Sequence, residues 1–330
     1  MNLSNIAAGS TGSNCYRSGL TADADAQSAA LIYGRWKQRY DQLSSGCFEG
    51  RVEELELPPF TVLKESSNRI IHQAGSAPSG VFALGAVTHL SGDAYFRGDI
   101  LRHRCLAMIN PLREFELRTS EHFEIVGAAF SAEVLCAHLN DPSVDFKDLE
   151  QDLYKVGKTV DNLQTEPMQS FLLRLLETAR ENPDVMLVSE NVSSIAEEFY
   201  ERLNNCLNPQ HQVIATSVCE NRDRLVRRVR AYLDASHDSA VTISDVCRDV
   251  GVTRRTLQNA TQEVLGVSPQ HYLKAVRLNG LRRDLKLRDP ARESIGDVAS
   301  RWGFWHLSQL AQDYRRLFGE LPSQTPLRLH

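Results

Sequence analysis

The chain has 330 residues, of which 42% are hydrophobic and 24% are charged, and its formal net charge is −5. This length and composition predict a globular protein of two domains, each with a packed core. No apolar run reaches the roughly 18 residues of a membrane span, and the polar residues 1–20 lack a signal-peptide pattern, so we expect a cytoplasmic protein that makes no contact with a membrane.

The first 130 residues predict mostly β-structure. Mixed helical periodicity over 21–43 indicates a helix, after which the pattern changes to short runs bounded by turn-prone residues such as Pro58, Gly92 and the Gly98-Asp99 pair. The predicted strands are 52–57, 60–64, 69–72, 80–87, 106–110, 115–118 and 123–130. Several short strands with this punctuation are typical of a barrel or sandwich.

Helical signals follow the strands. A helix is predicted over 131–139, a second begins at Thr165 and ends at Asn182, and a third stops near Pro209. The segment 208–212 is the best candidate for a domain boundary, so we predict one domain over 1–210 and another over 211–330.

The second domain has its own charge character. Residues 221–330 hold 19 Lys and Arg against 12 Asp and Glu, a net charge of +7, whereas residues 1–220 carry a net −12. A basic module attached to an acidic one indicates that only the C-terminal part meets phosphates.

An internal repeat fills most of this basic domain. Residues 243–269 and 295–322 follow one pattern, in which Ile243, Asp245, Val246 and Gly251 recur as Ile295, Asp297, Val298 and Gly303. After one inserted residue, Leu257, Gly266 and Pro269 recur as Leu310, Gly319 and Pro322. Two such units in register are much stronger evidence of a shared structure than one unit alone.

Each unit predicts a helix-turn-helix. A short helix ends at Gly251, where a left-handed turn is needed, and Thr253 then caps a second helix whose inward stripe includes Leu257. In the second unit the inward residues are Leu307 or Leu310, and Tyr314. A helix over 269–287 is predicted to join the two units.

The opposite faces of the two second helices carry side chains that suit base edges, since Arg pairs with guanine and Gln or Asn with adenine. The candidate DNA-binding residues are Thr253, Arg254, Arg255, Gln258, Asn259 and Gln262 in the first unit, and His306, Ser308, Gln309, Gln312 and Arg315 in the second. Arg227 and Arg228 are interpreted as a solvated helix face.

From about residue 215 to the end, the sequence resembles the AraC/XylS family of bacterial regulators. The resemblance is carried by the segment from Gly266 to Pro269, by Arg277, and by the stretch from Ile295 to Phe304 that runs on to Phe318-Gly319. It implies that the second helix of each unit enters an adjacent segment of the major groove of promoter DNA. The chain departs from the family at Thr261, where phenylalanine is usual, so we expect looser packing in the first unit.

The resemblance also implies a role for the N-terminal domain. Family members often carry a cupin-like, β-rich sensor there, so we expect an α+β chain in which residues 48–130 bind a small-molecule effector that remains unidentified. It further implies contact with RNA polymerase and activation of a catabolic or metabolic operon. Helices around 165–207 are the predicted dimer surface of a homodimer.

Motifs of other functional classes are absent from the sequence. There is no phosphate-binding Gly-x-x-x-x-Gly-Lys loop, no Gly-x-Ser-x-Gly elbow and no His-x-His pair. The histidines of the β-rich region stand singly, at His72, His89, His103 and His122. We therefore expect no catalytic residues, no metal and no cofactor.

The seven cysteines, which include Cys219, form no Cys-x-x-Cys pair and are interpreted as reduced thiols. Two alternatives to an effector-responsive regulator stay open from the sequence. One is an enzyme or storage-type barrel with a DNA-binding tail. The other is a constitutive DNA-binding protein whose N-terminal part is only a dimer scaffold.

Overall fold

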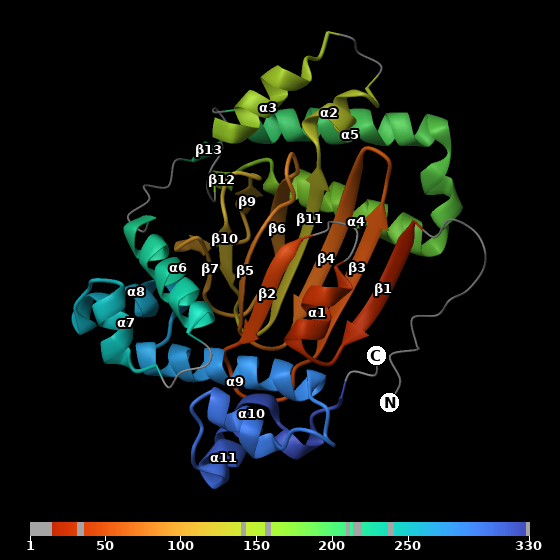
Figure 1. The fold of residues 1–330 in the computed structure, drawn as a ribbon. Coiled ribbons are helices and arrows are strands. Elements are labelled where there is room, and N and C mark those ends of the chain that lie inside the picture. The colour runs from red at the N-terminus through yellow and green to blue at the C-terminus, as the bar shows by residue number, and fades with distance from the viewer. Residues whose placement is uncertain are drawn as a thin grey trace.

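The computed structural model describes residues 15–31, 36–139, 143–155, 160–208, 212–213, 220–236 and 241–327. A β-rich N-terminal part packs against a helical C-terminal part, whose longest helix runs beneath the lower ends of the strands (Figure 1). The chain is therefore α+β, with strands and helices segregated along the sequence.

Two antiparallel sheets make up the N-terminal part. The larger sheet has the strand order β1-β3-β4-β11-β6-β9-β12-β13, and the smaller has β2-β5-β10-β7-β8. The larger sheet consists of β1 (Tyr16–Thr21), β3 (Gly50–Glu56), β4 (Phe60–Ser67), β11 (Phe123–Phe130), β6 (Phe82–Leu90), β9 (Cys105–Ile109), β12 (Val160–Asn162) and β13 (Gln212–Val213). The smaller sheet consists of β2 (Lys37–Gln42), β5 (Ile71–Ser76), β10 (Phe115–Arg118), β7 (Ala94–Phe96) and β8 (Asp99–Leu101).

The larger sheet is buried on both faces, as β11 shows. Along this strand Val126, Ala128 and Phe130 pack toward the helices that follow it, whereas Phe123 and Ile125 point into a second core shared with the smaller sheet. This alternation follows from the two-residue repeat of side chains along a strand. Because both faces of these strands are buried, most of them are apolar enough to be predicted from sequence.

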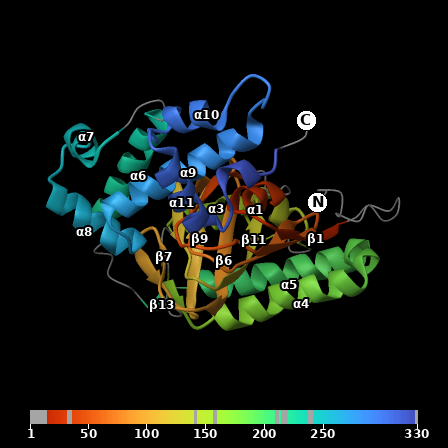
Figure 2. The ribbon, with the colours of Figure 1, turned by 90° about the horizontal axis from the view of Figure 1, so that it is seen from below.

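Two long helices cover the outer face of the larger sheet. Figure 2 shows α4 and α5 running together on the side of the sheet that faces away from the C-terminal helices. The helical segments of the N-terminal part are α1 (Ala24–Ala30), α2 (Ala132–Cys136), α3 (Phe146–Lys155), α4 (Thr165–Glu181), the 3-10 turn η1 (Pro183–Leu187) and α5 (Ser189–Leu207).

The C-terminal part is helical and has two separate small cores. Its elements are α6 (Glu220–Ala235), α7 (Ile243–Asp249), α8 (Arg254–Leu265), α9 (Pro269–Leu287), α10 (Ile295–Arg301), α11 (Leu307–Phe318) and the 3-10 turn η3 (Pro322–Gln324). The first core joins α6, α7, α8 and the first half of α9, and the second joins the remainder of α9 to α10 and α11. Helix α9 therefore belongs to both units.

The structure confirms the predicted strands of 48–130, with shifted ends, and corrects the prediction for 21–43. Among the described residues of this segment, Ala24–Ala30 is helical and Lys37–Gln42 is strand β2. Tertiary pairing decides this segment, because β2 pairs with β5 from Lys37 to Gln42 while Tyr40 and Asp41 become buried. The Gly98-Asp99 turn is the tip of a hairpin between β7 and β8, where Arg97 and Gly98 both have positive φ.

The cysteines of the described residues form no disulfide, and Cys219 lies outside those residues. Within the described part, no helix combines the length and apolarity needed to cross a membrane.

Close packing of α9 against the second core gives a direct stability test. A Cβ at Gly280 of α9 would lie 2.1 Å from the ring of Trp302, so we expect Gly280→Ala to destabilise the chain by about 1–3 kcal/mol through overpacking. Gly296 on α10 is the matched control, because a Cβ there meets nothing closer than 3.5 Å. Urea unfolding should leave Gly296→Ala within about 1 kcal/mol of the wild type; equal losses in both variants would contradict the packing described.

Candidate nucleic-acid interface

The two repeated units share the same helix cap and the same turn glycine. The first helix of each unit begins with a capping box, Thr242 with Asp245 in α7 and Ser294 with Asp297 in α10. It is followed by a glycine with positive φ, Gly251 at 67° or Gly303 at 73°. A glycine tolerates this left-handed conformation without strain, so the chain can turn sharply into the second helix.

The second helix of the first unit, α8, presents a polar face to solvent. Thr253 caps it by accepting a hydrogen bond from the Thr256 amide at 3.1 Å. Leu257, Ala260 and Val264 are buried, and all six candidate residues of this unit are exposed. Arg254 is partly engaged, since its guanidinium donates to Ser244 Oγ of α7 at 2.7 Å.

The second helix of the second unit, α11, also has a buried apolar face and an exposed polar face. Leu310 and Tyr314 are buried, whereas Leu307 is 52% exposed, so Leu310 is the inward residue of the two that the sequence allowed. His306, Ser308, Gln309, Gln312 and Arg315 are all exposed. Trp302 packs in the core, but Trp305 is 69% exposed just before the helix begins.

Helix α9, which is 19 residues long, lies between the two units. At about 1.5 Å per residue it is about 28 Å long. Arg277, near its middle, donates a hydrogen bond to the Val241 carbonyl and so ties α9 to the start of the first unit. The two exposed faces are thus held apart by one continuous helix that both units pack against.

Thr261 is buried in α8 and donates a hydrogen bond to the Leu257 carbonyl at 3.1 Å. A small cavity lies beside it, bounded also by Leu257, Tyr272 and Leu273. The cavity measures about 10 Å³, roughly the space that one water molecule needs, so any loosening of the first unit at this position is small.

Comparison with known proteins identifies this helical part. Residues 246–328 match the family model described as "Helix-turn-helix domain". The "Probable thc operon regulatory protein" of Rhodococcus erythropolis is 40% identical over 100 residues, which are 30% of each chain. The "XylDLEGF operon transcriptional activator" of Pseudomonas putida is 29% identical over 98 residues, again 30% of each chain.

The C-terminal domain is a helix-turn-helix domain of the AraC type. The chain spans about 30% of the length of the first of these relatives, so the match covers this domain and not the N-terminal part. Among solved structures, the AraC-like transcriptional activator CuxR aligns with 79% of this chain and 93% of its own, at 14% identity and a TM-score of 0.42. ToxT from Vibrio cholerae aligns with 88% and 96%, at 12% identity and a TM-score of 0.28.

The helix-turn-helix domain is bound to the N-terminal part through a buried ionic cluster that the sequence did not predict. Asp41, near the end of β2, is fully buried and pairs with Arg230 of α6 and Arg283 of α9. Burial alone raises the pKa of Asp41, but the positive charges of Arg230, Arg283 and Arg39 outweigh it and hold the pKa well below its usual range. The carboxylate therefore stays ionised in the folded protein.

Further polar contacts of β2 and α1 extend this interface. The Gln42 backbone and the Asn279 side chain exchange two hydrogen bonds, with N···O distances of 3.0 and 2.9 Å. The Gln42 side chain also donates to the Leu317 carbonyl of α11 at 2.6 Å. Lys286 of α9 donates to Asp23, the cap of α1, at 2.7 Å. Strand β2 thus contacts α6, α9 and α11.

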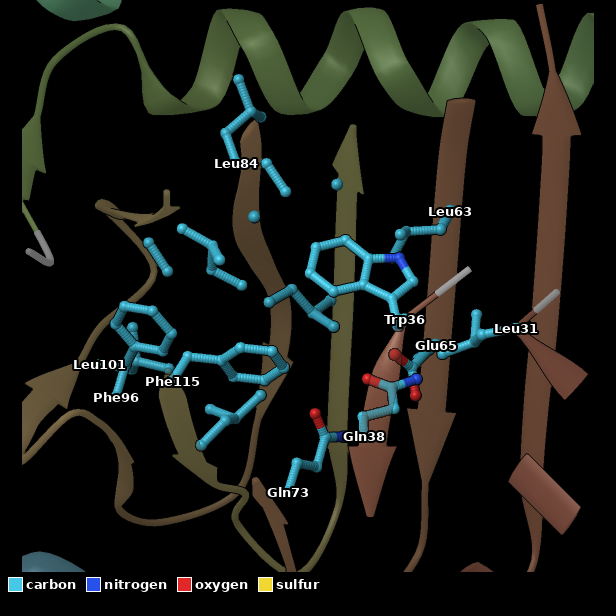
Figure 3. A pocket seen from close by; sticks show the side chains of 17 residues that line it. Leu31, Trp36, Gln38, Leu63, Glu65, Gln73, Leu84, Phe96, Leu101 and Phe115 are labelled. Atoms are coloured by element: carbon cyan, nitrogen blue, oxygen red, sulfur yellow. The ribbon is translucent and has the colours of Figure 1, made fainter. Parts of the chain in front are cut away.

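A cavity of about 70 Å³ lies between the two sheets of the N-terminal part (Figure 3). A water molecule needs roughly 10–15 Å³ by this measure, so the cavity has room for several non-hydrogen atoms. Its walls are mostly apolar, and Glu65, Gln38 and Gln73 supply polar groups. Burial raises the pKa of Glu65 to about 7, and the negative charge of Glu54 adds to the rise, while hydrogen bonds from Gln27 and Tyr40 oppose it.

The single histidines of the β-rich region do not converge. His72 is buried and faces Glu116 and the Tyr272 hydroxyl, which is 3.3 Å from its Nδ1. In the described part of the chain, no three His, Cys, Asp or Glu side chains are grouped so as to hold a metal ion.

Proposed function

We propose that this chain is a sequence-specific DNA-binding transcription regulator, in which two recognition helices read adjacent segments of the major groove. The observation that carries the proposal is the pair of exposed polar faces on α8 and α11, both fixed to α9. The matched relatives are named as regulators or activators of operons, which supports the same function.

Each candidate residue has a role in this proposal. Arg255, Gln258 and Asn259 on α8, and Ser308 and Gln312 on α11, face base edges. The remaining candidates lie at the margins of these faces and contact phosphates or sugars, which position the helices without reading sequence. They are Thr253, Arg254, Gln262, His306, Gln309 and Arg315.

Substitution of base-reading residues tests the proposal. We expect Arg255→Ala and Gln312→Ala each to weaken binding to the selected site by about 1–3 kcal/mol and to relax preference at a few base pairs. Arg113→Ala in the loop between β9 and β10, an exposed arginine outside both units and outside the α4–α5 region, is the control for loss of one positive charge. Fluorescence anisotropy on matched and scrambled duplexes measures both effects; unchanged sequence preference in Arg255→Ala would refute the assignment of α8.

The cavity between the sheets is proposed as the effector site. Most residues that line it lie in the predicted segment 48–130, and the others lie between the end of α1 and β2. Strand β2 connects the cavity to the DNA-binding helices. Gln38 of this strand lines the cavity, and Asp41 of the same strand holds Arg230 and Arg283. Coupling of this kind is reciprocal, so effector and operator should change each other's affinity by the same factor.

The remaining parts of the proposal concern partners. We propose a homodimer that associates through the α4–α5 region, where Leu163, Val185 and Val188 are exposed, and that contacts RNA polymerase to activate a catabolic or metabolic operon. Action on promoter DNA places the protein in the cytoplasm. Sedimentation of Val188→Asp against the wild type tests the dimer surface.

A further inference from the structure

We propose that the effector is a small hydrophobic amine, whose ammonium group pairs with Glu65 while its apolar body lies against the aromatic side of the cavity. The inference rests on the proposed function, because it names the chemical class of the ligand for the proposed effector site.

The apolar part of the cavity fits a compact hydrocarbon body. Trp36 and Phe115 meet edge to face in its wall, with ring centroids 5.9 Å apart, and Phe96 and Leu101 lie near them. Small residues of the larger sheet leave the space open, namely Ala83, Gly85, Ala107 and Gly127. Walls of this kind bind apolar groups, and the few polar groups between them set orientation and specificity.

The polar side of the cavity is acidic. Figure 3 shows Glu65 beside Gln38, with Gln73 nearby. Among the described residues that line the cavity, Glu65 is the one ionisable side chain. Its carboxyl group accepts hydrogen bonds from the Tyr40 hydroxyl at 2.9 and 3.0 Å and from Gln27 at 3.1 Å, and both donors are neutral.

A buried carboxylate is costly unless a cation pairs with it, and the hydrogen bonds from Tyr40 and Gln27 supply no charge. The elevated pKa of Glu65, about 7, reflects this incomplete compensation. A ligand cation supplies the missing charge, whereas a ligand carboxylate placed here adds a second negative charge to a buried site.

The number of hydrogen-bond acceptor groups in the cavity matches the number of donors of an ammonium group. An ammonium has three donors and no acceptor. Glu65 offers its carboxylate, and Gln38 and Gln73 each carry an amide oxygen. The side-chain nitrogen assigned to Gln38 is buried, and the neighbouring polar group is the neutral Tyr40 hydroxyl. Because an amide can be turned to exchange oxygen and nitrogen, Gln38 can face the ammonium with an acceptor.

Calorimetric titration of the full chain at neutral pH tests the proposal with matched probes. The first set is benzylamine, benzyl alcohol and benzoate, and the second is butylamine, butanol and butanoate, so that only the polar group changes within a set. We expect at least one amine to bind at least tenfold more tightly than its alcohol, and the carboxylates not to bind. Failure of both amines, or an alcohol or carboxylate that binds as well as its amine, would overturn the proposal.

Two variants locate the binding. Glu65→Gln should weaken amine binding at least tenfold and leave alcohol binding within twofold, whereas Glu124→Gln, a charge loss on β11 outside the cavity lining, should change neither. Ala107→Leu should block every probe by filling the cavity. Amine binding that survives both Glu65→Gln and Ala107→Leu would overturn the site. If Glu65→Gln fails to fold, the probe comparison on the wild type decides alone.

Failure of amine binding can be distinguished from failure of the proposed DNA-binding function. DNA binding of the wild-type chain is measured without any probe. Sequence-specific DNA binding together with failure of the amines overturns the effector class and leaves the regulator intact. Amine binding without sequence-specific DNA binding overturns the regulator.

Discussion

Asp41→Asn is expected to lower the free energy of unfolding by about 3–5 kcal/mol, because it removes the one carboxylate that Arg230 and Arg283 share and leaves Arg230 buried with less compensation. Urea unfolding at pH 7 followed by circular dichroism measures the loss. The folded-state pKa of Asp41 lies below its usual value, so this stabilisation is present above about pH 4 and is lost as the pH falls further.

Glu198→Gln is the matched control for Asp41. Glu198 on α5 also faces two arginines, at 3.4 Å from Arg174 and 2.6 Å from Arg202, but its side chain is 43% exposed. Exposed pairs contribute about 0–1 kcal/mol, so this variant should stay close to the wild type. Similar losses in the two variants would mean that the interface between β2 and the helices is not held by a buried charge.

Glu65→Gln should change how stability depends on pH. The pKa of Glu65 is about 7 in the folded chain against an ordinary value of 4.5. From pH 4.5 to 7 the unfolded chain loses this proton and the folded chain keeps it, so the wild type becomes less stable as the pH rises. One pKa unit corresponds to about 1.4 kcal/mol, which gives a loss of about 3 kcal/mol that the glutamine variant does not suffer.

The relevant measurement for Glu65 is the difference in unfolding free energy between variant and wild type at pH 5, 6, 7 and 8. We expect the difference to rise by about 2.5 kcal/mol across this range in favour of the variant. A difference that stays constant with pH would show that Glu65 is ionised in the folded state throughout. The constant part of the difference, which includes any altered hydrogen bonds to Tyr40 and Gln27, does not enter the test.

The helix-turn-helix units were predictable because their signals are local. Thr253, Gly251 and the apolar stripe through Leu257 lie within a few residues of one another, and the repeat supplies the same signals twice. The strands facing the core were predictable for the same reason, since a short apolar run such as Phe123 to Phe130 is visible in sequence.

The missed features depend on partners distant in sequence. The residues of Lys37–Gln42 are mostly polar, and only the pairing with β5 and the burial of Tyr40 and Asp41 make this segment a strand. Arg230 looks like its neighbouring arginines on α6, and nothing near it in sequence shows that it reaches Asp41. Glu65 lies in an ordinary alternating strand, so its place in the cavity became visible only when the two sheets were assembled.

Selection of binding sites from random duplexes by the purified full chain tests whether both helix-turn-helix units read DNA. Two recognition helices in adjacent segments of the major groove on one face of DNA predict two conserved blocks whose centres lie about 10–10.5 base pairs apart. Arg255→Ala should lose preference in one block, and Gln312→Ala in the other. Enrichment of no sequence, or of a single block that both variants alter alike, would contradict a regulator that reads DNA through both units.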